Sequence, residues 1–289
     1  MPVSRGNLMN TNKAFCIIIL MITLAASTKA QNEMYGSNEE AGHYLNVGDA
    51  RIYYEVYGEG RPLILLHGGL YGYIDEYENY IPKLSKHFKV IAIALRGHGR
   101  SEIGTKPISY KLIADDAIAV LKNESKDSAI VIGFSDGAIT AYVLAADYQS
   151  NIRMVVAIGG GLALSGYTPG GLEWLNNFSP ENFEKRNAKF IAERKRIMPE
   201  PERWNEFLEK MKVVWTEPVW VSPEKAKNIK CSVLTIGGDR DDFLTTEQFV
   251  QTYKSIPKSQ LAIIPNSGHV KSMAYPFVFD YIIMPFIMK

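Results

Sequence analysis

The sequence predicts an α/β fold, a doubly wound and mostly parallel sheet with an inserted helical cap. Short, wholly apolar runs alternate with helix-forming segments over residues 62–158 and again after residue 232, which is typical of parallel strands buried on both faces. Residues 162–230 interrupt this alternation and contain all four tryptophans. These aromatic side chains indicate helices that cover an apolar surface, with most rings packing on one another and two or three lining a pocket.

The strands are predicted from runs of apolar or β-branched residues that end in glycine-rich loops. Two aromatic-rich runs around Gly48 predict a hairpin, and the later runs predict parallel strands. The expected strands are 43–47, 51–57, 62–66, 89–95, 128–133, 153–158, 232–236 and 260–264. Ligands of such sheets bind at the carboxyl ends of the strands, so we expect the glycine-rich loops to face one crevice.

The helices are predicted from the segments that separate these strands. Prolines at 180, 199, 201, 218 and 223 divide the cap into helices. The expected helices are 76–87, 110–122, 138–148, 181–197, 201–214, 245–255 and a last one from Pro276.

The composition is that of a globular protein with one large core. The chain has 289 residues, of which 46% are hydrophobic and 22% charged, and its formal net charge is +1. Basic residues are neither in excess nor clustered, so nothing indicates a nucleic-acid partner. The five histidines and two cysteines are too scattered to predict a metal site. We expect a small-molecule substrate and no cofactor.

The first 30 residues have the pattern of a secretory signal peptide. Arg5 and Lys13 precede the apolar run 14–26, and small and polar residues lead to Ala30. We expect cleavage after Ala30, a secreted or periplasmic product without a membrane partner, and a single domain over residues 31–289. An uncleaved N-terminal anchor is the alternative, although the apolar run is shorter than the ~20 residues that a membrane span needs.

The pentapeptide at 133–137 has the form G-x-S-x-G and lies between an apolar strand and a helix. Such a serine sits on a tight, strained turn at a helix N-terminus, where partial positive charge favours a developing anion. Ser135 is therefore the expected nucleophile. A serine hydroxyl also needs a base and a group that orients the base.

One histidine, His269, follows Ser135 in the chain, and it comes directly after a predicted buried strand. Three aspartates, Asp239, Asp241 and Asp242, follow the preceding strand and compete for the role of the acid. The order serine, aspartate, histidine is one of the known orders for such a triad. His67 and His98 are expected to hold loops through hydrogen bonds.

Together these motifs resemble the α/β-hydrolase family over residues 43–289. The motifs that carry the resemblance are His67-Gly68-Gly69, Arg96-Gly97-His98-Gly99-Arg100-Ser101, the elbow at 133–137, the Gly238-x-x-Asp241 turn and Gly268-His269. The resemblance implies that Asp241 is the triad acid, with Asp242 as the second choice. It also implies an oxyanion hole made by the N–H groups of Asp136 and of Gly69 or Leu70.

Asp136 has two interpretations. An acidic side chain in the first turn of a helix is favourable by itself, by about 0.3–1 kcal/mol. The elbow is also similar to that of valacyclovir-hydrolase-like amino-acid ester hydrolases, in which this aspartate binds the α-ammonium group of the substrate. The second interpretation makes Asp136 a substrate-binding residue.

The function expected from these residues is that of an exported serine hydrolase. Its substrate would be a small ester, lactone or amide, with a carboxylic ester favoured, and the reaction would pass through an acyl-enzyme. One alternative is a hydrolase or lyase of the same fold that acts on a C–C bond with the same triad. Another is a small-molecule sensor without turnover.

Overall fold

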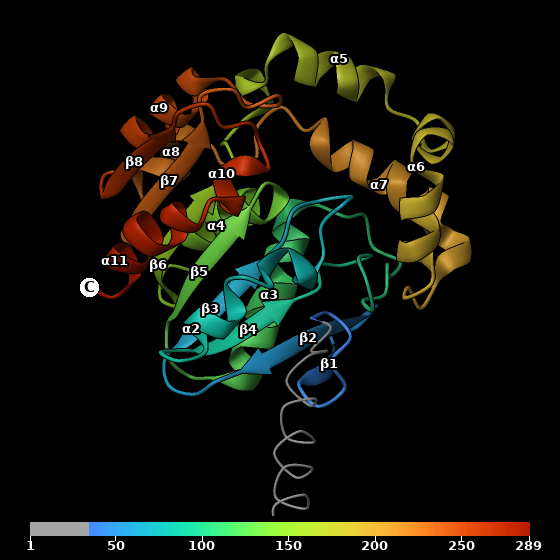
Figure 1. The fold of residues 1–289 in the computed structure, drawn as a ribbon, viewed down its shortest axis with the longest axis horizontal. Helices are drawn as coiled ribbons and strands as arrows, with labels where there is room; N and C mark the ends of the chain where they lie inside the picture. The colour runs from blue at the N-terminus through green and yellow to red at the C-terminus, as the bar shows by residue number, and fades with distance from the viewer. Residues whose placement is uncertain (1–34) are drawn as a thin grey trace, which may run out of the picture. The chain divides into compact units, whose positions relative to one another are not determined.

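The structure is a computed structural model, and it describes residues 35–289. The expected signal peptide and its cleavage site lie outside the described residues. Eight strands form one sheet in the order β1-β2-β4-β3-β5-β6-β7-β8 (Figure 1). The strands are β1 (Gly42–Asn46), β2 (Arg51–Tyr57), β3 (Pro62–Leu66), β4 (Lys89–Ile93), β5 (Ala129–Phe134), β6 (Ile152–Ile158), β7 (Ser232–Gly238) and β8 (Ser259–Ile264).

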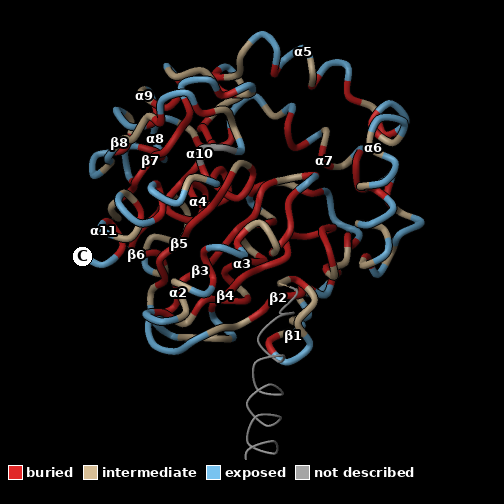
Figure 2. Tube along the Cα trace, viewed as in Figure 1, coloured by how far each residue is buried: buried red, intermediate tan, exposed pale blue. Residues whose placement is uncertain are grey.

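The pairing of the strands confirms the predicted mostly parallel α/β sheet. β1 and β2 form the predicted antiparallel hairpin, β2 is antiparallel to β4, and every other pair is parallel. Side chains alternate between two cores, as in β3, where Leu63 and Leu65 face one core and Ile64 and Leu66 face the other. Figure 2 shows these central strands buried along their length.

Helices cover both faces of the sheet. One face carries α3 (Tyr110–Glu124), α4 (Asp136–Asp147), α8 (Pro223–Lys227) and α9 (Thr246–Ser255). The other carries η1 (Ile74–Tyr77), α2 (Ile81–Leu84), α10 (Lys271–Ala274), η4 (Val278–Ile283) and α11 (Met284–Ile287). No helix within residues 35–289 is long and apolar enough to span a membrane.

The single helix predicted over residues 76–87 is wrong. The structure has two short pieces there, η1 and α2, separated by three residues without helical assignment. Pro82 lies in the first turn of α2, where its missing N–H needs no partner. The same proline would remove a hydrogen bond and clash with the preceding turn inside a continuous helix, so α2 starts anew at Ile81.

Residues between β6 and β7 form α6 and α7 close to the two helices predicted for the cap, and also α5 and α8, which were not predicted. α5 (Pro169–Asn177), α6 (Pro180–Lys195) and α7 (Trp204–Trp215) arch over the carboxyl ends of the strands (Figure 1). α5 and α6 each begin with a proline after a capping Thr168 or Ser179, whose side chain accepts a backbone N–H. α8 instead contacts α4 and α9. The helix predicted from residue 201 begins instead at Trp204, because residues Pro201–Arg203 form a 3₁₀ turn.

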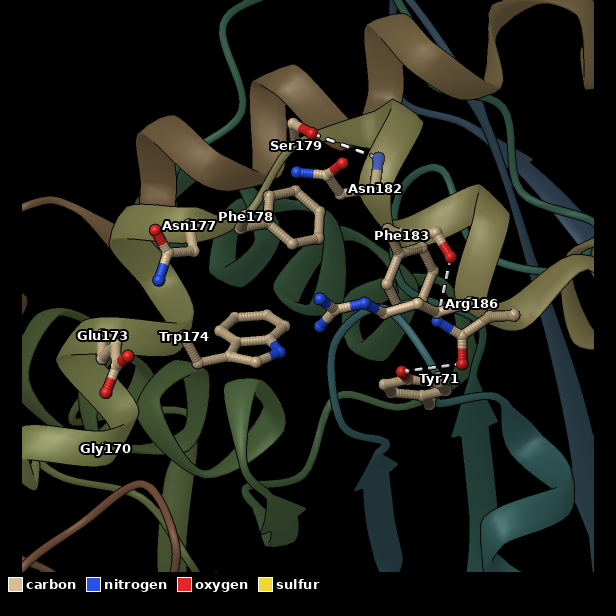
Figure 3. Close-up of a pocket in the computed structure, with 11 residues that line it drawn as sticks. Tyr71, Gly170, Glu173, Trp174, Asn177, Phe178, Ser179, Asn182, Phe183 and Arg186 are labelled. Atoms are coloured by element: carbon tan, nitrogen blue, oxygen red, sulfur yellow. Dashed lines mark hydrogen bonds between the residues drawn. The ribbon is translucent and has the colours of Figure 1, made fainter.

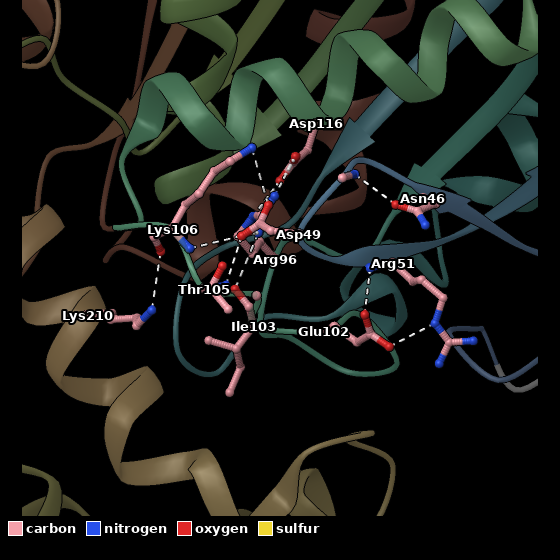
Figure 4. Close-up of polar contacts among 12 residues, drawn as sticks. Asn46, Asp49, Arg51, Arg96, Glu102, Ile103, Thr105, Lys106, Asp116 and Lys210 are labelled. Atoms are coloured by element: carbon pink, nitrogen blue, oxygen red, sulfur yellow. Dashed lines mark hydrogen bonds and ion pairs between the residues drawn. The ribbon is translucent and has the colours of Figure 1, made fainter.

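A buried ion cluster around Arg96 ties three distant segments together (Figure 4). The Arg96 guanidinium donates to both oxygens of Asp116 in α3, at 2.8 and 2.9 Å, and to Asp49 in the β1–β2 turn at 3.0 Å. Asp49 also accepts the N–H groups of Thr105 and Lys106. Burial alone would raise the pKa of Asp49, but these N–H groups and Arg96 hold it below its usual range.

Arg96→Met should lower the free energy of unfolding by about 3–5 kcal/mol, because it leaves the buried Asp116 without its cation and leaves Asp49 with Lys106 alone. Arg51→Met is the matched control, since Arg51 is more than half exposed and pairs with Glu102 at the surface. We expect a much smaller change in the free energy of unfolding for the control, because exposed ion pairs contribute little. Urea unfolding of both variants measures the difference, and equal losses would contradict the role given to Arg96.

Candidate active site

The turn between β5 and α4 holds Ser135 in a strained conformation. Its φ of 52° and ψ of −117° lie in a region that residues with a side chain rarely adopt. The flanking glycines leave the space that this turn needs. A Cβ on Gly133 would lie 2.2 Å from the Gly137 carbonyl oxygen, and a Cβ on Gly137 would lie 1.9 Å from that of Leu66. The strand and the helix can therefore approach closely enough to lift the hydroxyl out of the sheet.

The structure brings Ser135, His269 and Asp241 together at the carboxyl edge of the sheet. His269 Nε2 lies 2.9 Å from Ser135 Oγ, and His269 Nδ1 lies 2.8 Å from Asp241 Oδ2. The other Asp241 oxygen accepts the N–H groups of Phe243 and Leu244 at 2.9 and 3.0 Å. With Nδ1–H donated to the carboxylate, the hydrogen-bond network assigns Nε2 as the acceptor for the serine proton.

The two aspartates that competed with Asp241 lie elsewhere in the turn after β7. Asp239 accepts the Ser267 N–H and so braces the loop that leads to His269. Asp242 is exposed, and its carbonyl accepts the Thr168 hydroxyl at the start of α5. Asp241 is thus the member of this group whose carboxylate contacts His269.

Ser135 and His269 face a pocket of about 570 Å³. Its floor comes from the loops that follow β3, β5, β7 and β8, and its roof from the cap. Its aromatic lining consists of Tyr71, Phe134, Tyr167, Trp174, Trp215 and Phe243. Within residues 35–289, no group of three or more His, Cys, Asp or Glu side chains is placed to hold a metal ion.

The loop after β3 is held by two buried histidines. His67 Nε2 accepts the Leu95 N–H at 2.9 Å, and His98 Nε2 accepts the Leu70 N–H at 3.0 Å. Burial lowers the pKa of His98 to about 4 and that of His67 well below its usual value, so both rings stay neutral. These bonds give both residues the loop-holding role expected of them.

The Leu70 N–H is therefore not a candidate donor to an oxyanion, because His98 already accepts it. This corrects the alternative that the sequence left open between Gly69 and Leu70. Within the described chain the Gly69 N–H has no acceptor. Gly69 also lies against the elbow, since a Cβ there would be 1.9 Å from Asp136 Oδ2.

The Asp136 carboxylate is buried beside the nucleophile and has two donors. Tyr110 Oη donates to Oδ1 at 2.8 Å, and Trp215 Nε1 donates to Oδ2 at 2.9 Å. Burial raises the pKa of Asp136, and no lysine or arginine of residues 35–289 forms an ion pair with it. The sequence did not predict either donor, because both approach from elements far along the chain without a local signal.

Glu76 is a further carboxyl group of the pocket, and no pattern in the sequence indicated it. It lies in η1, and its Oε2 accepts the Gly68 N–H at 2.8 Å. Burial raises the pKa of Glu76 to about 7, while the Gly68 N–H, Arg194 and His269 act in the opposite direction. The group therefore holds the loop that follows β3, and its pKa lies near neutral pH.

Comparison with protein families decides the family of this chain. Residues 62–236, more than half of the sequence, match the model described as alpha/beta hydrolase fold. The chain belongs to this family. It is a hydrolase, in keeping with the hydrolases and esterases among its relatives.

Similar proteins match between about half and most of the chain. The AB hydrolase superfamily protein YisY of Bacillus subtilis is 28% identical over 249 residues, which are 79% of this chain and 92% of that protein. The pimeloyl-[acyl-carrier protein] methyl ester esterase of Proteus mirabilis is 29% identical over 150 residues, 49% of this chain and 55% of the esterase. A solved N-acyl homoserine lactone degrading enzyme has a TM-score of 0.69 at 22% identity, covering 84% of this chain and all of that one.

Glu76→Gln should change how stability depends on pH. The raised pKa means that the folded protein holds this proton more tightly than the unfolded chain does. The stability that the protonated carboxyl contributes is thus complete below about pH 4.5 and is lost as the pH rises through about 7. Because the pocket is partly open to solvent, we expect this contribution to the free energy of unfolding to be on the order of 2 kcal/mol.

The measurement is the free energy of unfolding in urea from about pH 4 to about pH 8. Relative to the native protein, Glu76→Gln should gain stability across this window, because glutamine never ionises. The exposed Glu78→Gln serves as the control and should follow the native curve. Parallel curves for all three proteins would show that the environment of Glu76 does not favour its neutral form.

Proposed function

We propose that this hydrolase is an exported serine enzyme that cleaves a small ester, lactone or amide through an acyl-enzyme. The observation that carries the proposal is the continuous contact from Asp241 through His269 to Ser135 on a strained elbow. Such a relay activates a serine hydroxyl, which is otherwise a weak nucleophile. Support for export comes from the signal-like pattern of residues 1–30.

In the proposed reaction, Ser135 Oγ attacks the carbonyl carbon while His269 Nε2 accepts the hydroxyl proton. The Asp241 carboxylate orients the ring and stabilises the imidazolium. The oxyanion is received by the N–H groups of Asp136, the first residue of α4, and of Gly69. His269 then returns the proton to the leaving group, and the same steps with water release the acid. Each oxyanion donor is typically worth about 3–4 kcal/mol of barrier height.

The character of the pocket favours a largely apolar acyl or alcohol group. Aromatic rings from the cap and the core make up much of its lining. The esterase among the relatives agrees with an ester substrate, and it is the ester that we favour. The alternative that acts on a C–C bond uses the same three residues. The alternative of a small-molecule sensor has no turnover. Assays of substrate turnover therefore separate the sensor from the two enzymes, and the choice of substrate separates the enzymes from each other.

His269→Asn and Ser135→Ala should each lower kcat/KM for a p-nitrophenyl ester by roughly 10³-fold or more, because each removes one step of the relay. His87→Asn is the matched control, since His87 is exposed and lies between α2 and β4. A fluorophosphonate probe should label the native protein and the control but not Ser135→Ala. Absence of labelling of the native protein between about pH 6 and pH 9 would overturn the proposal.

Asp136 is proposed to receive a cationic group of the substrate. A carboxylate has about four lone-pair positions, and Tyr110 and Trp215 occupy two of them. Asp136→Asn should therefore lower kcat/KM more for an α-amino ester than for the neutral ester of the same shape. Loss of equal size on both esters would show that this side chain serves only to hold the elbow and the cap together.

A further inference from the structure

A second pocket lies within the cap, next to the one that contains Ser135. Its volume is about 780 Å³, and residues of α5, of α6 and of the segment between them line it (Figure 3). Tyr71 and Trp174 line both pockets. These two residues border both spaces, so the two pockets adjoin each other.

Arg186 of α6 extends into this second pocket. Figure 3 shows its guanidinium between Trp174 on one side and Phe183 on the other. Three other basic residues of α6 form ion pairs, namely Lys185, Arg194 and Lys195. Arg186 forms none within residues 35–289. Its charge therefore faces the pocket without an ion pair, although the exposed Glu173 carboxylate lines the same pocket.

The direction of Arg186 is set by a break in α6. Asn187 has the non-helical angles φ −130° and ψ 26°, and its side-chain amide donates to the Phe183 carbonyl at 2.9 Å. The Tyr71 hydroxyl donates to the Asn187 side chain at 3.3 Å. Tyr71 follows the Gly69 loop directly, so the residue next to Arg186 is tied to the wall of the active-site pocket.

The other groups of the second pocket suit a carboxylate more than a dianion such as phosphate. Asn177 and Asn182 bring amide groups to its lining, and a planar guanidinium pairs well with the two oxygens of a carboxylate. Glu173 also lines the pocket and would repel a second negative charge. Arg186, Asn177 and Asn182 are exposed to solvent, so a ligand carboxylate can reach all three side chains.

We propose that this pocket is a specificity subsite that binds a carboxylate at the far end of the substrate, with Arg186 as the residue that pairs with it. The substrate class is then an ester or related acyl compound whose acyl or alcohol chain ends in a carboxylate. The inference rests on the proposed function in one respect, namely that the reacting carbonyl lies at Ser135.

The test compares p-nitrophenyl esters of dicarboxylic acids, in a series of chain lengths, with neutral esters of the same length. Arg186→Gln should raise KM for the best carboxylate ester by about tenfold and leave kcat nearly unchanged, because the contact lies far from the reacting atoms. Neutral esters should change less than about twofold. Glu173→Gln is the matched control and should not weaken the carboxylate ester. Equal KM changes on charged and neutral esters would overturn the subsite.

A binding measurement keeps the subsite separate from catalysis. Titration calorimetry with Ser135→Ala measures Kd for monomethyl esters of the same dicarboxylic acids. Adding Arg186→Gln should weaken this binding by about tenfold, and adding Glu173→Gln should not. Arg186-dependent binding without hydrolysis of any ester would refute the proposed function and retain the subsite. Binding with the same Kd in the presence and absence of Arg186→Gln would refute the subsite, whether or not esters are hydrolysed.

Discussion

The strained backbone at Ser135 is the constraint on which the site depends. A positive φ costs a residue with a side chain about 1–3 kcal/mol, and the surrounding structure must supply that energy. It does so through the close approach of α4 to β5 and β3, which only glycine permits at Gly133 and Gly137. The result is a hydroxyl that projects toward His269 at 2.9 Å. Larger residues at either glycine would push α4 away and break this contact before any chemistry could occur.

The opposite wall of the pocket is held by buried polar groups, which also fix Leu70 at a positive φ of 57°. Arg96 fixes the loop that carries His98, and neutral His98 in turn accepts the Leu70 N–H. Glu76 holds the Gly68 N–H from the other side. Because buried donors without acceptors are costly, each of these bonds restricts the loop to one conformation. The loop that follows β3 is thus positioned by segments that lie up to 28 residues away along the chain, from Leu70 to His98.

The sequence predicted those parts of the molecule that have local signals. Apolar runs placed the strands within a few residues, and the glycine spacing around Ser135 indicated the elbow. Pro82 is a local signal against a continuous helix over residues 76–87, because proline is disfavoured in the interior of a helix. Glu76, Tyr110 and Trp215 could not be found in this way. Their roles arise from contacts across 8, 26 and 79 residues, which only the folded chain creates.

Chemistry and specificity are built on different parts of the chain. Ser135, Asp241 and His269 follow core strands, whereas Trp215 and Arg186 belong to the cap. The Trp215 bond to Asp136 joins the two parts at the residue next to the nucleophile. Charge is distributed unevenly between the pockets, since a buried carboxyl lies beside Ser135 and a guanidinium without an ion pair in residues 35–289 lies beyond Trp174. In the proposed subsite, this asymmetry favours an elongated substrate whose negative end lies in the cap, away from the carboxyl group of the elbow.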